Sequence, residues 1–322
     1  MTEDVRVGLV VAFAELGETE LEAVETAWAS AKADAKHWKP QAVSYGLDTI
    51  GDEMIQSDLL VYLGESSRFT SVVRPALETT PLLLVKSTVG ELLNRSPQEA
   101  PRYRMCTSVE GIASTLANLA PPAPSVEWDT LPWPDSVRHF IDLDSGERSF
   151  VETSVDAFRR AAETRGISWE TGLPAEDQAF SVFLTMHDPA ASHLADVALT
   201  RWPQCTVLAA DGMVATRRPD GEPWPGRVVR VRHWAATVDS ACNRAFAEVA
   251  GEPLPDFDSA GMLFGAFYFL ENAFAAGGTP DGLELAGRHP GPLGLMRLTA
   301  SGRPEPERLL VFEGEESRVV LV

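Results

Sequence analysis

The chain has 322 residues, of which 44% are hydrophobic and 23% charged, so it is too long for one ordinary core and predicts a folded protein of two lobes. Its 47 acidic and 27 basic side chains give a formal net charge of −20, which repels phosphate backbones and argues against a nucleic-acid partner. No apolar run reaches the roughly 18 residues of a membrane span, so we expect no direct membrane insertion.

The first part of the chain alternates short apolar runs with amphipathic segments. Residues 5–13 are predicted as a buried strand, and residues 18–36 as a helix because apolar side chains recur at a spacing of three to four. The elements predicted next are strands over 41–45, 57–63, 81–85 and 102–107, and helices over 66–78 and 109–119. Strands that alternate with helices predict a parallel sheet covered on both faces.

A proline-rich stretch follows, with five prolines between Ala120 and Pro134. Proline neither continues a helix nor sits in a central strand, so this stretch is predicted to be a boundary between lobes. After it the α/β pattern restarts. The elements predicted there are strands over 137–143, 179–185, 205–210 and 228–231, and helices over 150–165, 190–202 and 238–249.

The end of the chain breaks the simple tandem. Residues 258–276 form a long apolar helix that stops at Gly277-Gly278, and short strands follow over 295–299, 308–313 and 318–322. We expect the helix to return to the first lobe and the closing hairpin to the second. The predicted N-terminal lobe is residues 1–121 with 253–300, and the predicted C-terminal lobe is residues 135–252 with 307–322.

Several segments in order resemble one protein family. Arg6-Val-Gly-Leu-Val10 is similar to the opening strand of the branched-chain amino acid and amide binding proteins. Leu63-Gly-Glu-Ser-Ser67, followed by a helix and a strand that opens at Pro81, resembles their next landmark. The segments 258–278 and 291–304 resemble the family's late helix and its Gly-x-x-Gly turn. The resemblance to these class I periplasmic binding proteins covers nearly the whole chain, although residues 14–17 lack the usual Thr-Gly pair.

The resemblance implies an α/β fold of two Rossmann-like lobes with parallel sheets, a hinge and an interlobe cleft. It implies a ligand-binding protein, not an enzyme and without a cofactor, that closes around an amino acid, an amide or a similar small molecule. It would be the solute-binding component of an ABC-type uptake system, or a related sensor. The partner would be a membrane permease if an export signal has been removed and the location is periplasmic, or a regulatory protein if the chain is complete and cytoplasmic.

Ligands of open parallel sheets bind beyond the carboxyl ends of the strands. By this rule and by the resemblance, the predicted ligand-binding residues are Phe13, Glu65, Ser66, Ser67, Ser87, Thr88, Phe150 and Asp211. Ser66 and Ser67 open a predicted helix, where free N–H groups and hydroxyls suit a carboxylate or amide oxygen, although ordinary N-capping explains them equally well.

The remaining assignments rest on the resemblance. Amino-acid-binding members hold the ligand's ammonium group with an acidic residue of the second lobe, and Asp211 is the best position for it, with Glu222 as a substitute. A surface carboxylate of a very acidic protein is the competing interpretation of Asp211. Phe150 is placed where the family often sets an aromatic ring against the ligand.

Enzyme and metal motifs are missing from the sequence. It contains no dinucleotide-binding, phosphate-binding, nucleophile-elbow or zinc-protease motif, and its three cysteines and six histidines have no metal-site spacing. One alternative is a two-lobed amino acid racemase, with Cys106 and Cys205 as paired acid and base. Against it, Cys106 lacks the asparagine that usually follows. A third alternative is a module that has lost its ligand and acts through protein contacts.

Overall fold

The computed structural model describes residues 5–13, 17–65, 68–86, 90–96, 98–137, 148–175 and 177–322. Contacts divide the chain into two compact units, which we call unit 1 (Met1–Ser108 with His233–Arg308) and unit 2 (Val109–Arg232 with Leu309–Val322). The chain therefore passes between the units three times, after residues 108, 232 and 308.

Unit 1 is built on a five-stranded parallel sheet in the order β2-β1-β3-β4-β5. Its strands are β1 (Val5–Ala12), β2 (Trp38–Tyr45), β3 (Leu59–Gly64), β4 (Leu82–Leu84) and β5 (Arg102–Arg104). All six residues of β3 are buried, as expected of a central strand covered on both faces. The apolar run that suggested this strand is thus explained by burial on two sides.

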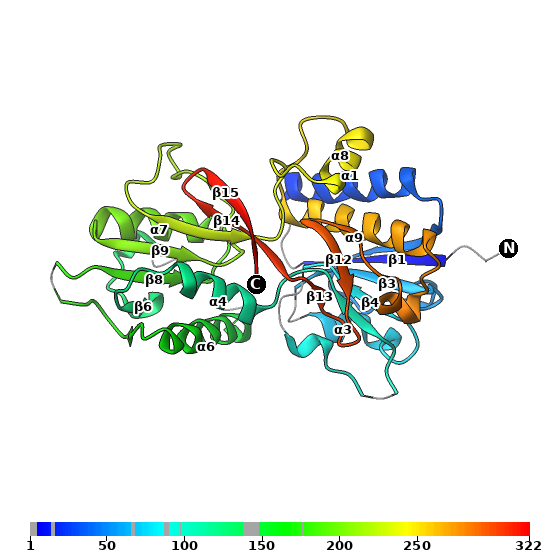
Figure 1. The fold of residues 1–322 in the computed structure, drawn as a ribbon, viewed down its shortest axis with the longest axis horizontal. Coiled ribbons are helices and arrows are strands. Elements are labelled where there is room, and N and C mark those ends of the chain that lie inside the picture. Colours follow the sequence, from blue (N-terminus) through cyan, green and yellow to red (C-terminus); the bar gives the residue numbers. More distant parts are fainter. Residues whose placement is uncertain are drawn as a thin grey trace. The chain divides into compact units, whose positions relative to one another are not determined.

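Helices cover both faces of this sheet (Figure 1). On one face lie α1 (Glu18–Asp34), α8 (Ala241–Ala250) and α9 (Asp258–Ala275), which pack on one another. On the other face lie the short helices α2 (Asp52–Ile55) and α3 (Phe69–Val73). The unit also contains the 3₁₀ turns η1 (Arg74–Ala76), η2 (Gly90–Leu93) and η5 (Pro280–Leu285), and a small antiparallel sheet of β11 (His289–Gly291), β12 (Gly294–Leu298) and β13 (Pro304–Glu305).

The core beneath α9 is fixed by one tryptophan. Trp234 is fully buried, and its indole Nε1–H donates to Asn243 Oδ1 at 2.6 Å. The Asn243 side chain in turn donates to the carbonyls of Ala235 and Val238, each at 2.9 Å. Gly261 of α9 lies directly on the indole, since a Cβ there would come within 1.9 Å of Trp234 Cδ2.

Unit 2 contains a seven-stranded sheet in the order β15-β14-β10-β9-β8-β6-β7. Its strands are β6 (Ser125–Glu127), β7 (Trp169–Glu170), β8 (Phe180–Leu184), β9 (Cys205–Ala209), β10 (Val228–Arg232), β14 (Arg308–Glu313) and β15 (Glu316–Leu321). The pairings from β7 to β10 are parallel, whereas β14 pairs antiparallel with β10. Helix α7 (Ala190–Arg201) covers one face, and α4 (Val109–Leu119) and α6 (Arg148–Thr164) lie together on the other (Figure 1).

The proline-rich stretch lies within unit 2 and is not a boundary between the units, which corrects the prediction. It contains β6, whose neighbours are β7 and β8, and its Trp128 and Trp133 are buried in the core of unit 2. The indole of Trp133 donates to the carbonyl of Trp128, which folds the stretch back on itself. The prolines fall on either side of β6, so they do not remove a donor from inside the strand. The strand predicted over 137–143 falls almost entirely on residues outside the described part.

Two helices belong to a different unit from the one predicted. Helix α4 is grouped with unit 2 because it packs on α6 and β10, and α8 is grouped with unit 1 because it packs on α1 and α9. The helix predicted over 66–78 is also shorter, because α3 begins at Phe69 and gives way to the 3₁₀ turn that contains Pro75. Within the described ranges, no helix combines the length and the hydropathy needed to span a bilayer.

Candidate ligand-binding site

The strands of unit 1 end side by side at one edge of the sheet. Ala12 of β1 pairs with Gly64 of β3, and Leu84 of β4 pairs with Arg104 of β5. Gly64 is required by close backbone approach, because a Cβ there would lie 2.4 Å from the Ala12 carbonyl oxygen. The sheet therefore brings the segments that follow β1 and β3 together, which is the position that parallel sheets offer to ligands.

Phe13 and Glu65, two of the predicted ligand-binding residues, are thus neighbours at this edge. Phe13 is half-buried against the core beneath α1 and α9. The backbone N–H of Glu65 donates to the Ala12 carbonyl at 2.9 Å, and the carboxylate lies 3.7 Å from the Arg68 guanidinium. The Glu65 backbone is held further by Tyr62, whose hydroxyl donates to its carbonyl at 2.8 Å. Burial, with a smaller contribution from the Glu65 charge, raises the pKa of Tyr62, so this hydroxyl stays protonated.

The other predicted residues of this edge lie outside the described part of the chain. They are Ser66, Ser67, Ser87 and Thr88. Lys86 was not among the predicted residues, although it is half-buried and is separated from β4 by a single residue, Val85. The rule that selected Phe13 and Glu65 selects it too, because it is the first charged residue beyond an apolar strand. Lys86 adds a cation to an edge whose predicted residues carry one acidic group and no base.

The carboxyl edge of the unit 2 sheet contains Asp211, which is predicted to bind the ligand. Leu184 of β8 pairs with Ala209 of β9, and the two chains stay together beyond the strands, because Asp188 donates its N–H to the Gly212 carbonyl at 3.1 Å. A Cβ at Gly212 would lie 2.6 Å from the Met186 carbonyl oxygen, so glycine permits this approach. Asp211 lies in this junction.

Asp188 and Asp211 both lie at this edge, and the Asp188 carboxylate has a structural role. The Asp188 carboxylate accepts from the backbone N–H groups of Ser192 at 3.0 Å and of Val214 and Ala215, each at 2.7 Å, so it ties α7 to the loop after β9. Asp211 is 5% exposed, which makes it a buried carboxylate at a strand end and not a surface residue. Glu222, the substitute, is exposed in a loop. Phe150 lies in the first turn of α6, which begins two residues earlier than predicted.

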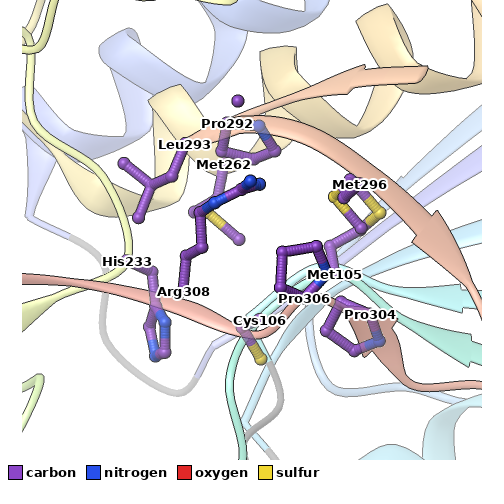
Figure 2. A pocket seen from close by; sticks show the side chains of 11 residues that line it. Met105, Cys106, His233, Met262, Pro292, Leu293, Met296, Pro304, Pro306 and Arg308 are labelled. Carbon is purple, nitrogen blue, oxygen red and sulfur yellow. The ribbon is translucent and has the colours of Figure 1, made fainter. Parts of the chain in front are cut away.

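A small pocket lies beside β5 in unit 1 (Figure 2). Met105, Met262 and Met296 line it with His233 and with the side chains named in the figure. Its volume is about 20 Å³, enough for one water or two but not for an amino acid. Its thioethers fill an irregular gap in the core, which is the usual role of methionine.

The described positions of the cysteines give the racemase alternative no support. Cys205 is the first residue of β9, at the opposite end of the strand from the carboxyl edge. It is buried, and burial raises its pKa to about 12, whereas an acid–base thiol needs a pKa near the working pH. Cys106 is buried as well.

We therefore expect the thiols to react slowly with a disulfide reagent at pH 8. Cys106, Cys205 and Cys242 are all buried free thiols, and burial also raises the pKa of Cys242 to about 12. Labelling with Ellman's reagent should be slow in the native protein and complete, at three thiols, in guanidinium. Rapid native labelling that a Cys205→Ser variant abolishes would show an accessible thiolate there and revive the racemase alternative.

Comparison with solved structures identifies the fold. The chain is similar to the leucine-binding protein of Thermotoga maritima, with a TM-score of 0.68, 14% identity and coverage of 99% of this chain and 98% of that one. It is similar to the branched-chain amino acid binding protein of Streptococcus pneumoniae in complex with isoleucine, with a TM-score of 0.70, 13% identity and coverage of 99% and 100%.

A third similar structure is a solute-binding protein of an ABC transporter from R. palustris in complex with benzoate, with a TM-score of 0.64, 14% identity and coverage of 99% and 95%. No family model and no curated protein matches the sequence. The chain has the class I periplasmic binding protein fold, as the sequence analysis predicts.

Proposed function

We propose that this chain is a binding protein without catalytic activity that binds a small polar molecule at the carboxyl edge of a parallel sheet. The observation that carries the proposal is the buried carboxylate of Asp211 at the carboxyl end of β9, in a fold whose strand ends are the natural ligand position. A carboxylate at a strand end attracts a cationic group, and its burial limits the screening of that charge by solvent. The ammonium group of an amino acid or another small amine is such a group.

The similar structures support this ligand class without fixing it. Their ligands are leucine, isoleucine and benzoates, all small carboxylates. Lys86 at the edge of unit 1 offers a cation to such a carboxylate, and Phe13 offers an apolar surface.

The partner in this proposal is a membrane permease of the ABC type, to which the closed form delivers its ligand. The alternative partner is a regulatory protein that reads the closed form, which would make the chain a sensor. Ligand binding is common to both, and it is therefore the property to test first.

A thermal-shift screen tests the proposal. The panel should contain the proteinogenic amino acids, short amides, polyamines and benzoates, because these classes separate ligands with an ammonium group from ligands without one. Any compound that binds the folded state stabilises it, by about 2.7 kcal/mol at one hundred times its dissociation constant. We expect at least one amino acid or amide to raise the melting temperature. A panel with no stabilising compound would contradict the proposal.

A further inference from the structure

A polar cavity lies at the β5 edge of unit 1, apart from the carboxyl edge described above. Its volume is about 110 Å³, and Arg95, Arg102, Tyr103, Asp281, Glu284 and Ser301 contribute to its lining. Arg102 opens β5, so the cavity lies at the amino end of that strand, whereas the candidate site lies where the strands end. The space is sufficient for several waters or for one small organic molecule.

Arg102 is a cation held in a fixed position among the residues that line this cavity. Its side chain is only 7% exposed, and its guanidinium is fixed by the carbonyls of Leu92 at 3.2 Å and Asn94 at 2.8 Å and by the Glu99 carboxylate at 2.7 Å. The Nε–H is buried and has no acceptor in the described part of the chain. The contacts with Leu92, Asn94 and Glu99 hold the positive charge of the guanidinium in place beside the cavity.

Another part of the lining is acidic. The buried Tyr103 donates its hydroxyl to Glu284 Oε2 at 2.5 Å and lies 3.2 Å from the Asp281 carbonyl oxygen. This contact fixes the Glu284 carboxylate and leaves its second oxygen able to accept from another donor. Asp281 is exposed and lines the same cavity. The cavity thus combines two guanidinium groups, from Arg95 and Arg102, with two carboxylates.

We propose that this cavity binds a small zwitterion of the α-amino acid class, independently of the site at the carboxyl edges. The ligand carboxylate lies beside the guanidinium groups of Arg95 and Arg102, and the ligand ammonium donates to Glu284 and Asp281. A simple anion would meet the two carboxylates, and a simple cation would meet the two arginines. Only a molecule that carries both charges satisfies both groups of side chains.

Titration of the full chain with glycine, acetate and methylamine, followed by two-dimensional NMR, tests this proposal. We expect glycine to shift the amide signals of residues 281–284 and 300–302 in a saturable way, and acetate and methylamine to bind at least about tenfold more weakly. An Ala300→Trp substitution at an exposed lining position fills the cavity and should weaken glycine binding at these amides by about tenfold or more. Thr26→Trp, at an exposed position of α1, is the matched control and should leave binding unchanged.

A second variant keeps the proposal testable if Ala300→Trp does not fold. Glu284→Gln keeps an acceptor for the Tyr103 hydroxyl but removes one negative charge, so it should weaken glycine binding and leave the melting temperature near that of the native chain. If acetate binds as tightly as glycine, the ligand of this cavity is not a zwitterion. If Ala300→Trp leaves glycine binding unchanged, glycine does not bind in this cavity. Asp211→Asn should not alter these amide shifts, so failure of the carboxyl-edge site and failure of this cavity give different results.

Discussion

The Gly261→Ala variant is expected to lose about 3 kcal/mol of its free energy of unfolding, or to fail to fold. The added methyl would come within 1.9 Å of Trp234 Cδ2 and 2.1 Å of Cε2, and no real Cβ tolerates either distance. The indole cannot yield, because it is fully buried and its N–H donates to Asn243, whose side chain donates to the backbone carbonyls of Ala235, Ala236 and Val238. Alanine is a better helix former than glycine by about 1 kcal/mol, which offsets part of the steric cost. The steric cost is therefore larger than the net loss in the free energy of unfolding.

Gly51→Ala is the matched control for this prediction. Gly51 has a φ of −87° and nothing within 4 Å of the added carbon, so the same substitution should change the free energy of unfolding by less than about 1 kcal/mol. Denaturant unfolding of the three proteins, followed by circular dichroism, measures both values. Equal stability of the Gly261 and Gly51 variants would mean that α9 and Trp234 are not packed as described.

The Asp211→Asn variant is expected to bind an amine-bearing ligand at least about thirtyfold more weakly, a loss of about 2 kcal/mol. The substitution keeps the shape of the side chain and removes the charge that would pair with the ligand ammonium. Because Asp211 is buried, little solvent screens that charge, so its loss matters more than that of a surface carboxylate. Isothermal titration of both proteins with the best ligand of the thermal-shift panel gives the ratio.

Glu222→Gln controls for the change in net charge. Glu222 is exposed and was the substitute for Asp211 in the sequence analysis, so its neutralisation should leave affinity unchanged. If Glu222→Gln weakens binding and Asp211→Asn does not, the two assignments are reversed. If the ligand is a benzoate without an amine, Asp211→Asn should spare its binding, and the ligand class proposed from the buried carboxylate is then wrong.

The strands and long helices of both units were predictable because burial dictates their residues. β3 and β9 consist of residues that are all buried, and such runs are recognisable without any knowledge of neighbours. The long apolar helix α9 was predictable for the same reason, because fourteen of its eighteen residues are buried. The fold class follows from the alternation of these elements.

The proline-rich stretch shows where local reasoning failed. Three residues, Ser125–Glu127, form a strand because β7 and β8 provide partners on both sides, and those partners are distant in the sequence. Prolines on either side are compatible with such a short strand, although they suggested a boundary between lobes. The predicted lobes also placed α4 and α8 in the wrong unit. A helix belongs to the unit against which it packs, and those partners are distant in the sequence.

The candidate site was predictable only as far as strand ends can be located. Phe13, Glu65 and Asp211 follow strands whose ends the apolar pattern marks within a residue or two, and the structure shows the first two as neighbours. The burial of Asp211 was not predictable, because it depends on how the segment after β9 approaches β8 through Gly212. Lys86 was missed although the same rule selects it.

Isothermal titration of the native chain, using the compound that gives the largest thermal shift, tests the central claim most directly. We predict saturable binding at the carboxyl edge that holds Asp211, weakened by Asp211→Asn and unaffected by Ala300→Trp. If the compound is an α-amino acid, the cavity of unit 1 adds a second binding event that Ala300→Trp removes. We also predict that the compound is recovered chemically unchanged, because the protein binds without catalysis. Absence of saturable heat for every compound of the panel, or conversion of the bound compound to a product, would contradict the central claim.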